Sequence, residues 1–506
     1  MGMNRIRLVS EVLGGLFMNE LGRVFGGSGE GDSAVSSVDR ERRRAQEVRQ
    51  GLERLGPFYI KVGQMLSTRP DIVPPVMISE LEKLHDRVSP LPFSSFQPVL
   101  EEDLGTEWKE RFLHVEMLDP LGVASLAQVY SVTLRDGRPG VIKIQRPGIR
   151  DTVLEDMRMM RRAARMVGRC APRFNSVVDI EAMLGVLFDS MRSELDFTVE
   201  ASHMDQARKD IKSFRNLAVP DVEFCTPRVL VQSLAPGKSV REVDRAELAE
   251  RERLAMGEDL LAFTYRGFFV NRMFHADPHP GNIFVQPDGQ ATLIDWGMVG
   301  RVDRRTSLMI MLVLLNLAQN DGYGLAKAWI ELGHATPWAD VSAFVSDMSA
   351  LTPKIASASL SELNFGVTLT SVLQQSTKRG IKTNPVISVL GKAFGNIEGS
   401  VRCLAPELSL TQVFQEQMKR IMLDLVGEHF SLVQAATSMT ELMLGVGAAQ
   451  EQARTLARDL SNREFGFNVG NNGPEKENSR GLSLSPGALS LGGAAIWLHH
   501  RRNRGK

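Results

Sequence analysis

The stretch from His275 to Gly297, HADPHPGNIFVQPDGQATLIDWG, constrains the fold of this chain most, because its prolines exclude a regular helix where many polar side chains gather. Two short apolar runs in it flank Asp288-Gly289, a sequence typical of a hairpin turn. A hairpin brings its two ends together. We therefore expect Asn282, before the first strand, and Asp295, after the second, to lie side by side on irregular loops, where ligands are commonly presented.

The spacing of the polar residues in this stretch matches the catalytic loop of kinases. His275 stands two residues before Asp277, and four residues separate Asp277 from Asn282. In phosphoryl transfer the asparagine and the second aspartate hold Mg²⁺, which prefers hard oxygen ligands and takes only one or two protein carboxylates. The pattern predicts a magnesium site at Asn282 and Asp295.

Two other interpretations of the stretch compete with this one. His275 and His279 have the spacing of zinc ligands on a helix, but Pro278 and Pro280 exclude that helix. A purely structural loop remains as an alternative, since aspartate and asparagine are common in turns.

A second hairpin is predicted where two alternating apolar runs flank Asp136-Gly137 in LAQVYSVTLRDGRPGVIKIQ. Lys143 lies on its second strand, where a kinase places the lysine that contacts the phosphates, and Val141 shares its face as an apolar contact for adenine. The alternative is a surface lysine on an edge strand. For the acidic partner of this lysine, spacing alone leaves three candidates open in SELDFTVEAS: Glu194, Asp196 and Glu200.

Several features of ordinary protein kinases are missing. No G-x-G-x-x-G precedes Lys143, and the segment PLGVASLAQVY in its place offers Gly122, Ala124 and Ser125, whose backbone N–H groups are candidates to hold phosphate. An A-P-E triplet occurs only at Ala405 to Glu407, 110 residues beyond Asp295, which is too far to close an activation segment. We therefore expect no peptide-docking activation loop.

The bulk composition narrows the class of protein. The 506 residues suggest two to four lobes, and 60 Lys plus Arg balance 60 Asp plus Glu, which argues against a dedicated nucleic-acid binder. The three cysteines form neither a disulfide framework nor a metal pair, as in a reducing compartment. The expected fold is α+β and two-lobed, protein-kinase-like, with a helical extension in front and a largely helical C-terminal region. Its expected parts are an N-terminal helix and Gly/Ser linker (1–48), a helical extension (49–117), an N-lobe (118–235), a helical C-lobe (236–425), and a C-terminal helix, linker and basic tail (426–506).

Membrane contact is predicted only at the periphery. The apolar run Leu308 to Ala318 is too short to span a bilayer and predicts a buried helix. The tail joins a short apolar run, Ala488 to Leu498, to a basic end; we weigh contact with an anionic membrane surface against a disordered tail. No secretory signal is present, so the expected location is the cytoplasmic side, peripheral to a membrane, of an organelle if the source is a eukaryote.

These stretches together closely resemble the UbiB/ADCK family of atypical kinase-like proteins over about residues 50 to 410. The resemblance rests on the K-x-G-Q segment LGPFYIKVGQMLSTRPDIVP, the alanine-rich loop GVASLAQVY, the lysine segment VIKIQRPG, the segment ELDFTVEAS, and the catalytic-loop string HADPHPGN. Two residues depart from the family pattern: Gly122 stands where an alanine is usual, and Trp296 replaces the usual phenylalanine of D-F-G.

The resemblance implies a role for each site residue. Lys143 contacts the nucleotide phosphates and pairs with Glu200, and Asp277 is the catalytic-loop aspartate. Lys61 and Gln64, on one helix face, reach into the cleft toward Glu194 and Asp196. Asn282 and Asp295 hold Mg²⁺, and the loop with Gly122, Ala124 and Ser125 covers the nucleotide.

The resemblance also implies a function. It points to binding of ATP or ADP with Mg²⁺ and to ATP hydrolysis or small-molecule phosphorylation, in support of isoprenoid-quinone biosynthesis or membrane lipid metabolism. A prenyl-quinone or lipid ligand is the implied partner. The alternative is a catalytically weak pseudokinase that binds nucleotide and organises a biosynthetic complex.

Overall fold

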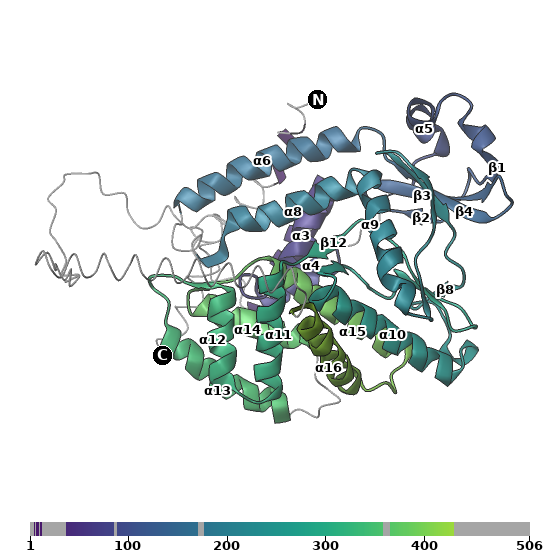
Figure 1. Ribbon diagram of the computed structural model, residues 1–506. Helices are drawn as coiled ribbons and strands as arrows, with labels where there is room; N and C mark the ends of the chain where they lie inside the picture. Colours follow the sequence, from purple (N-terminus) through teal and green to yellow (C-terminus); the bar gives the residue numbers. More distant parts are fainter. Residues whose placement is uncertain are drawn as a thin grey trace, which may run out of the picture. The chain divides into compact units, whose positions relative to one another are not determined.

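The computed structural model describes residues 37–84, 89–170, 177–357 and 365–429, together with residues 5, 7–9, 11 and 12 (Figure 1). Residues up to Gln415 form one compact unit, and a second unit begins at Glu416. The predicted Gly/Ser linker, Gly26 to Ser37, lies outside the described residues except for Ser37, and the predicted basic tail lies outside them as well.

The N-terminal extension is helical. It consists of α2 (Ser37–Leu55), α3 (Pro57–Ser67) and α4 (Pro75–Leu81). Pro57 occupies the first turn of α3, where its missing N–H costs no hydrogen bond. Helix α3 packs against α2 and α4, and a Cβ on Gly63 would lie only 2.3 Å from Leu84 Cδ1, so glycine permits this close approach.

The N-lobe is built on an antiparallel sheet with the strand order β1-β3-β4-β7-β6, in which β2 also pairs with β3. The predicted hairpin is confirmed: β3 (Ala127–Leu134) and β4 (Pro139–Gln145) pair in register around Gly137, whose φ of 85° suits the turn. One sheet face carries buried side chains, including Ile142 and Ile144, into a core; the opposite face of β4 presents Lys143. The other elements of this lobe are η1 (Phe93–Phe96), α5 (Gln97–Leu104), η2 (Trp108–Arg111), β1 (Phe112–Val115), β2 (Gly122–Val123), β6 (Val222–Cys225) and β7 (Val229–Ser233).

Long helices follow β4 in the chain: α6 (Ile149–Cys170), α8 (Ile180–Glu194) and α9 (Phe197–Asp210). A short turn, η3 (Ile211–Ser213), follows α9. Helix α9 contacts the sheet at β6 and β7. Figure 1 shows α9 beside the N-lobe strands, with α8 leading into it. This position brings the first turn of α9 to the face of the sheet that presents Lys143.

The C-lobe holds the second predicted hairpin, which is also confirmed. Strands β10 (Ile283–Val285) and β11 (Ala291–Leu293) pair antiparallel, and Gly289 in their turn has a φ of 85°. They belong to a four-stranded sheet of order β5-β11-β10-β8, with β8 at Lys238–Ser239. Strand β5 (Leu217–Ala218) precedes the expected lobe boundary at residue 235 yet pairs in parallel with β11.

The rest of the C-lobe is mostly helical. The predicted buried helix is confirmed as α11 (Arg304–Ala318), whose Ile310, Val313 and Leu314 are buried. No helix in the described part of the chain is long and apolar enough to cross a membrane. The remaining elements are η4 (Arg245–Glu247), α10 (Glu250–Phe269), β9 (Met273–His275), β12 (Val299–Arg301), α12 (Gly322–Leu332), β13 (His334–Ala335), α13 (Val341–Ser357), α14 (Phe365–Lys378), β14 (Ile381–Lys382), α15 (Val386–Leu404) and α16 (Leu410–His429).

Candidate functional site

Lys143 links the two lobes through carboxylates. Its ammonium lies 2.9 and 2.8 Å from the two carboxylate oxygens of Glu200 on α9, and 3.3 Å from Oδ1 of Asp295 in the C-lobe. The side chain of Glu200 is almost fully buried, whereas that of Asp295 is 53% exposed. Among the three acidic candidates, the geometry pairs Lys143 with Glu200. Asp295 keeps a solvent-facing side on which a ligand can bind.

Charge governs the protonation of Lys143 and Asp295. Burial disfavours the ammonium of Lys143, but the carboxylates of Glu200 and Asp295 outweigh burial and raise its pKa above the ordinary value. In return, the ammonium of Lys143 lowers the pKa of Asp295 to about 2. Both groups are therefore charged at neutral pH, as a cation that meets phosphate and an anion that meets a metal must be.

The hairpin closes the catalytic-loop segment as predicted from its turn. The N–H of Ile294 donates to the carbonyl of Asn282 over 3.0 Å, so Asp295 follows directly beside Asn282. The side-chain amide of Asn282 donates to the carbonyl of Asp277 over 3.1 Å. Because Nδ2 is used in this way, the carboxamide oxygen is the Asn282 atom left to face a cation.

His275 holds the start of the loop as a neutral imidazole. Its Nδ1 accepts from the backbone N–H of Asp277, so Nε2 carries the proton and donates to the carbonyl of Ile294 over 3.0 Å. Burial lowers the pKa of His275. Both ring nitrogens are engaged by backbone, so this imidazole orients the loop relative to Asp295 rather than serving as a metal ligand.

Asp295 is held in a left-handed backbone conformation, with a φ of 60°, which is uncommon for a residue other than glycine. Trp296, fully buried, anchors the turn: its indole N–H donates to the carbonyl of Leu293, and its own carbonyl contacts Nδ1 of His203 over 3.0 Å. His203 lies on α9, one turn beyond Glu200. The same helix therefore fixes both the Lys143 partner and the Asp295 turn. The sequence analysis did not predict a role for His203. Its spacing of three residues from Glu200, which places both on one face of α9, is the only sequence feature that indicates one.

The catalytic-loop aspartate is held by a helix far along the chain. The side-chain amide of Asn396 donates to Oδ1 of Asp277 over 2.5 Å, and the ammonium of Lys392 lies 3.4 Å from Oδ2. Ser400 donates to the carbonyl of Pro278 over 2.8 Å. Although burial favours the neutral acid, Lys392 and other nearby cations hold the pKa of Asp277 below its ordinary value. The sequence prediction did not include these three residues of α15.

In the extension, the structure brings together two of the four residues expected to meet in the cleft. The ammonium of Lys61 lies 3.0 Å from Glu194 Oε1. The side-chain amide of Gln64 donates to the carbonyl of Leu84, within the extension. The carboxylate of Asp196 caps α9 by accepting from the N–H of Thr198.

The alanine-rich loop is an ordered turn. Gly122 pairs with Val129 at the end of β2, and the N–H of Ala124 donates to the carbonyl of Ala127 inside the turn. That amide is therefore satisfied by the protein in this conformation, and Ser125 is buried. A Cβ on Gly122 would meet Val129 at an ordinary 3.9 Å, so alanine, the usual family residue, also fits here.

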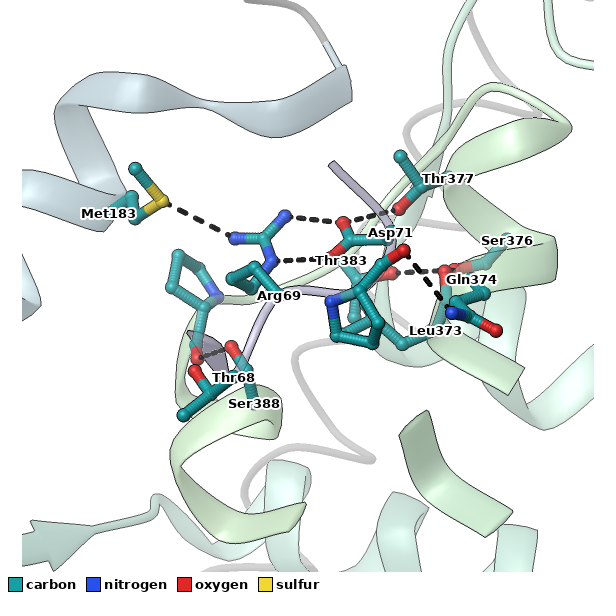
Figure 2. A network of polar contacts seen from close by, with 12 residues as sticks. Thr68, Arg69, Asp71, Met183, Leu373, Gln374, Ser376, Thr377, Thr383 and Ser388 are labelled. Carbon is teal, nitrogen blue, oxygen red and sulfur yellow. Dashed lines mark hydrogen bonds and ion pairs between the residues drawn. The ribbon is translucent and has the colours of Figure 1, made fainter. Parts of the chain in front are cut away.

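The extension is attached to the C-lobe around a buried ion pair, whose aspartate also contacts α14 (Figure 2). Arg69 donates to both oxygens of Asp71 over 2.7 and 2.6 Å. The hydroxyl of Thr377 on α14 also donates to Asp71, and the amide of Gln374 donates to the carbonyl of Pro70. In Figure 2, Asp71 lies between the Arg69 guanidinium and the α14 side chains. The chain that follows Lys61 is thus fastened to the lobe that carries Asp277.

The donor set suits Mg²⁺. Asn282 offers a carboxamide oxygen and Asp295 a half-exposed carboxylate. Magnesium binds through one or two protein oxygens, with water and phosphate oxygens as its other ligands. Residues Asn282 and Asp295 would hold the ion, which would neutralise charge on the phosphates.

The fold and the site define a class. The protein is two-lobed and kinase-like. Its first lobe has an antiparallel sheet that carries a lysine paired with a glutamate, and its helical second lobe carries Asp277, Asn282 and Asp295 on a catalytic loop and the hairpin that follows it. The predicted α+β fold is thereby confirmed. A family model, the ABC1 atypical kinase-like domain, matches residues 83–329.

Relatives place the chain within that class. The uncharacterized protein slr0889 of Synechocystis sp. is 30% identical over 69% of this chain and 88% of its own length. Proteins named probable protein kinase UbiB are 31% identical in Cellvibrio japonicus, over 72% of this chain and 67% of the relative, and 32% identical in Aeromonas salmonicida, over 76% and 71%. The chain belongs to the UbiB/ADCK family of atypical kinase-like proteins.

Proposed function

We propose that this protein binds Mg–ATP between its lobes and cleaves or transfers the terminal phosphate, in support of isoprenoid-quinone biosynthesis or membrane lipid metabolism. The observation that carries the proposal is the approach of Lys143 to Asp295 over 3.3 Å, with Asn282 beside Asp295 on the same hairpin. The cation, Lys143, comes from the N-lobe, and the two oxygen ligands, Asn282 and Asp295, come from the C-lobe. The stability of the fold does not require these groups to meet in a half-exposed site. Together they form a binding site for a metal–phosphate complex.

Each residue has a proposed task. Lys143 donates charge-assisted hydrogen bonds to the nucleotide phosphates, while Glu200 holds it in place. Asn282 and Asp295 orient the magnesium ion, and Asp277 accepts the proton of the attacking hydroxyl or water. Lys61, paired with Glu194, adds positive charge beside Asp277 and Asp295, whose pKa values it helps to lower.

The test is ADP release from ATP by the purified protein, with and without Mg²⁺. Asp295→Asn removes the metal-binding charge and should reduce Mg²⁺-dependent release at least about 100-fold, because electrostatic stabilisation is often the largest catalytic contribution. Asp288→Asn, in the exposed turn of the same hairpin, is the matched control and should leave release unchanged. Nucleotide binding with no release in the wild type would support the pseudokinase scaffold instead.

The pathway is tested separately. The proposal of quinone or lipid metabolism is supported by the UbiB names of several relatives. Quinones and lipids should be profiled in cells that lack this protein, complemented with wild type, Asp288→Asn or Asp295→Asn. A quinone or lipid defect that Asp295→Asn alone fails to restore is the expected result; normal profiles in the deleted cells would contradict the pathway.

A further inference from the structure

One face of helix α15 is directed at the catalytic loop. Lys392, Asn396 and Ser400 are spaced four residues apart, so their side chains lie in a row along the helix. All three contact the loop: Lys392 and Asn396 at the carboxylate of Asp277, and Ser400 at the carbonyl of Pro278. Ser400 is fully buried, so the helix is fixed against the loop at this point.

We propose that Lys392 is a catalytic residue that binds the terminal phosphoryl group while it is transferred. This inference rests on the proposed function. Within that function it assigns a role to a lysine that lies 97 residues beyond Asp295.

The catalytic loop itself supplies no lysine or arginine. Between Asp277 and Asn282 stand only Pro278, His279, Pro280 and Gly281. His279 uses Nδ1 to accept from the N–H of Gly281, so its imidazole carries no positive charge in this arrangement. Charge stabilisation beside Asp277 must therefore come from another segment of the chain.

Lys392 meets that requirement by position. Its ammonium is 3.4 Å from Asp277 Oδ2, a loose contact, and its side chain is 29% exposed. The backbone carbonyl of Asp277 accepts from the side-chain amide of Asn282, so the carboxylate that Lys392 contacts belongs to a residue hydrogen-bonded to a proposed magnesium ligand. Lys143 is engaged by Glu200 on the N-lobe side and Lys61 by Glu194, whereas the partner of Lys392 is the catalytic aspartate itself.

The chemical step conserves atoms and electrons. The bond between the γ-phosphorus and the β–γ bridging oxygen breaks, and ADP leaves with the electron pair. A bond forms between the γ-phosphorus and the oxygen of water or an alcohol, whose proton passes to Asp277. Negative charge is spread over the three oxygens of the phosphoryl group in transit, and the Lys392 ammonium, released from Asp277 as that carboxylate takes the proton, pairs with them.

The test compares a ground-state ligand with a transition-state mimic. Binding of Mg–ADP alone and of Mg–ADP with aluminium fluoride is measured for wild type, Lys392→Ala and Lys392→Arg. A residue that acts only in the transition state should leave Mg–ADP affinity within about threefold, while kcat and affinity for the fluoride complex fall together by roughly 100-fold. Lys392→Arg keeps the charge and should recover part of both. Lys327→Ala, an exposed lysine on α12, is the control.

The outcomes separate this inference from the proposed function. Equal loss of both complexes in Lys392→Ala would make Lys392 a ground-state or structural residue, and unchanged kcat would leave it no role; either overturns the inference while the function stands. A wild-type protein that neither binds Mg–ADP nor releases ADP overturns both. Retained Mg–ADP binding also shows that the variant is folded.

Discussion

At the scale of single residues, the sequence predicts the site best where only a few residues separate its members. Asn282 and Asp295 flank one hairpin, so the turn at Gly289 fixes their proximity, and Asp277 stands only five residues before Asn282. The partner of Lys143 was not decided by spacing, because the capping of α9 by Asp196 determines which acid faces the sheet. Asn396 lies 119 residues from Asp277, and no local pattern reports such a contact.

The buried pair of Lys143 and Glu200 gives the first prediction. Lys143→Met should weaken Mg–nucleotide binding at least about tenfold, since charge-assisted hydrogen bonds to phosphate are lost. It also leaves Glu200 buried without its partner, and breaking a buried pair costs roughly 3–5 kcal/mol of stability. Nucleotide titration and thermal unfolding measure the two effects separately.

A second substitution distinguishes these effects. Adding Glu200→Gln to Lys143→Met removes the unpaired buried charge, so stability should largely return while nucleotide affinity stays low. If affinity returned as well, Lys143 would hold the fold of the site rather than the phosphates.

At the scale of secondary-structure elements, hairpins with Asp-Gly turns and long helices were predictable, and very short strands were not. β5, β9 and β12 have two or three residues each, too few for any periodicity to show. They form only because tertiary contacts place them, as β12 pairs with β9 beside the catalytic loop. The attachment of the extension to α14 likewise depends on packing that no local pattern encodes.

The Arg69–Asp71 anchor carries a prediction about the extension. Asp71→Asn leaves the buried Arg69 guanidinium without its charged partner, which should cost about 3 kcal/mol or more. Hydrogen exchange of α3 and α4 should then rise more than that of α11. Asp189→Asn, which alters an exposed pair with Arg192, is the matched control. Unchanged exchange in α3 would show that apolar packing alone holds the extension.

The contact between α14 and α15 predicts a pH-dependent stability. Glu398 on α15 is fully buried and accepts from the N–H of Phe365; burial raises its pKa to about 7. The unfolded chain has a glutamate pKa near 4.3. Between about pH 4.3 and 7 the folded state binds more protons than the unfolded state, so this group's contribution to stability falls as pH rises through that window.

Glu398→Gln should remove this slope. The gain in the free energy of unfolding over wild type should be small at pH 5 and reach about 2–4 kcal/mol at pH 8. Each unit by which the pKa differs between the folded and unfolded states corresponds to about 1.4 kcal/mol. Thermal unfolding at a series of pH values measures it, with the exposed Glu331→Gln on α12 as the control. Parallel pH curves for wild type and Glu398→Gln would contradict a raised pKa at Glu398.

At the scale of the whole molecule, the two-lobed plan followed from the order of the sequence signals, a β-rich segment before a helical one. The lobe boundary is less regular than that order suggests, because β5 precedes it in the chain and pairs within the C-lobe sheet. The lobes meet in the site through Lys143 and Asp295, whose opposite charges stabilise each other only at close range. In the proposed function a bound metal–nucleotide complex would extend that contact, because Lys143 would hold its phosphates and Asp295 would hold its metal.

Nucleotide should therefore stabilise the two lobes together, and it should do so only in the presence of magnesium. A ligand at 100 times its dissociation constant adds about 2.7 kcal/mol to the stability of a folded state that alone binds it. We expect Mg–ADP to raise the unfolding temperature of wild type, while ADP with a chelator or magnesium alone has little effect. In Asp295→Asn the magnesium-dependent increment should vanish, and in Asp288→Asn it should persist. An equal rise with and without magnesium would mean that the nucleotide binds without engaging Asp295, and the two lobes would then not be joined through the metal.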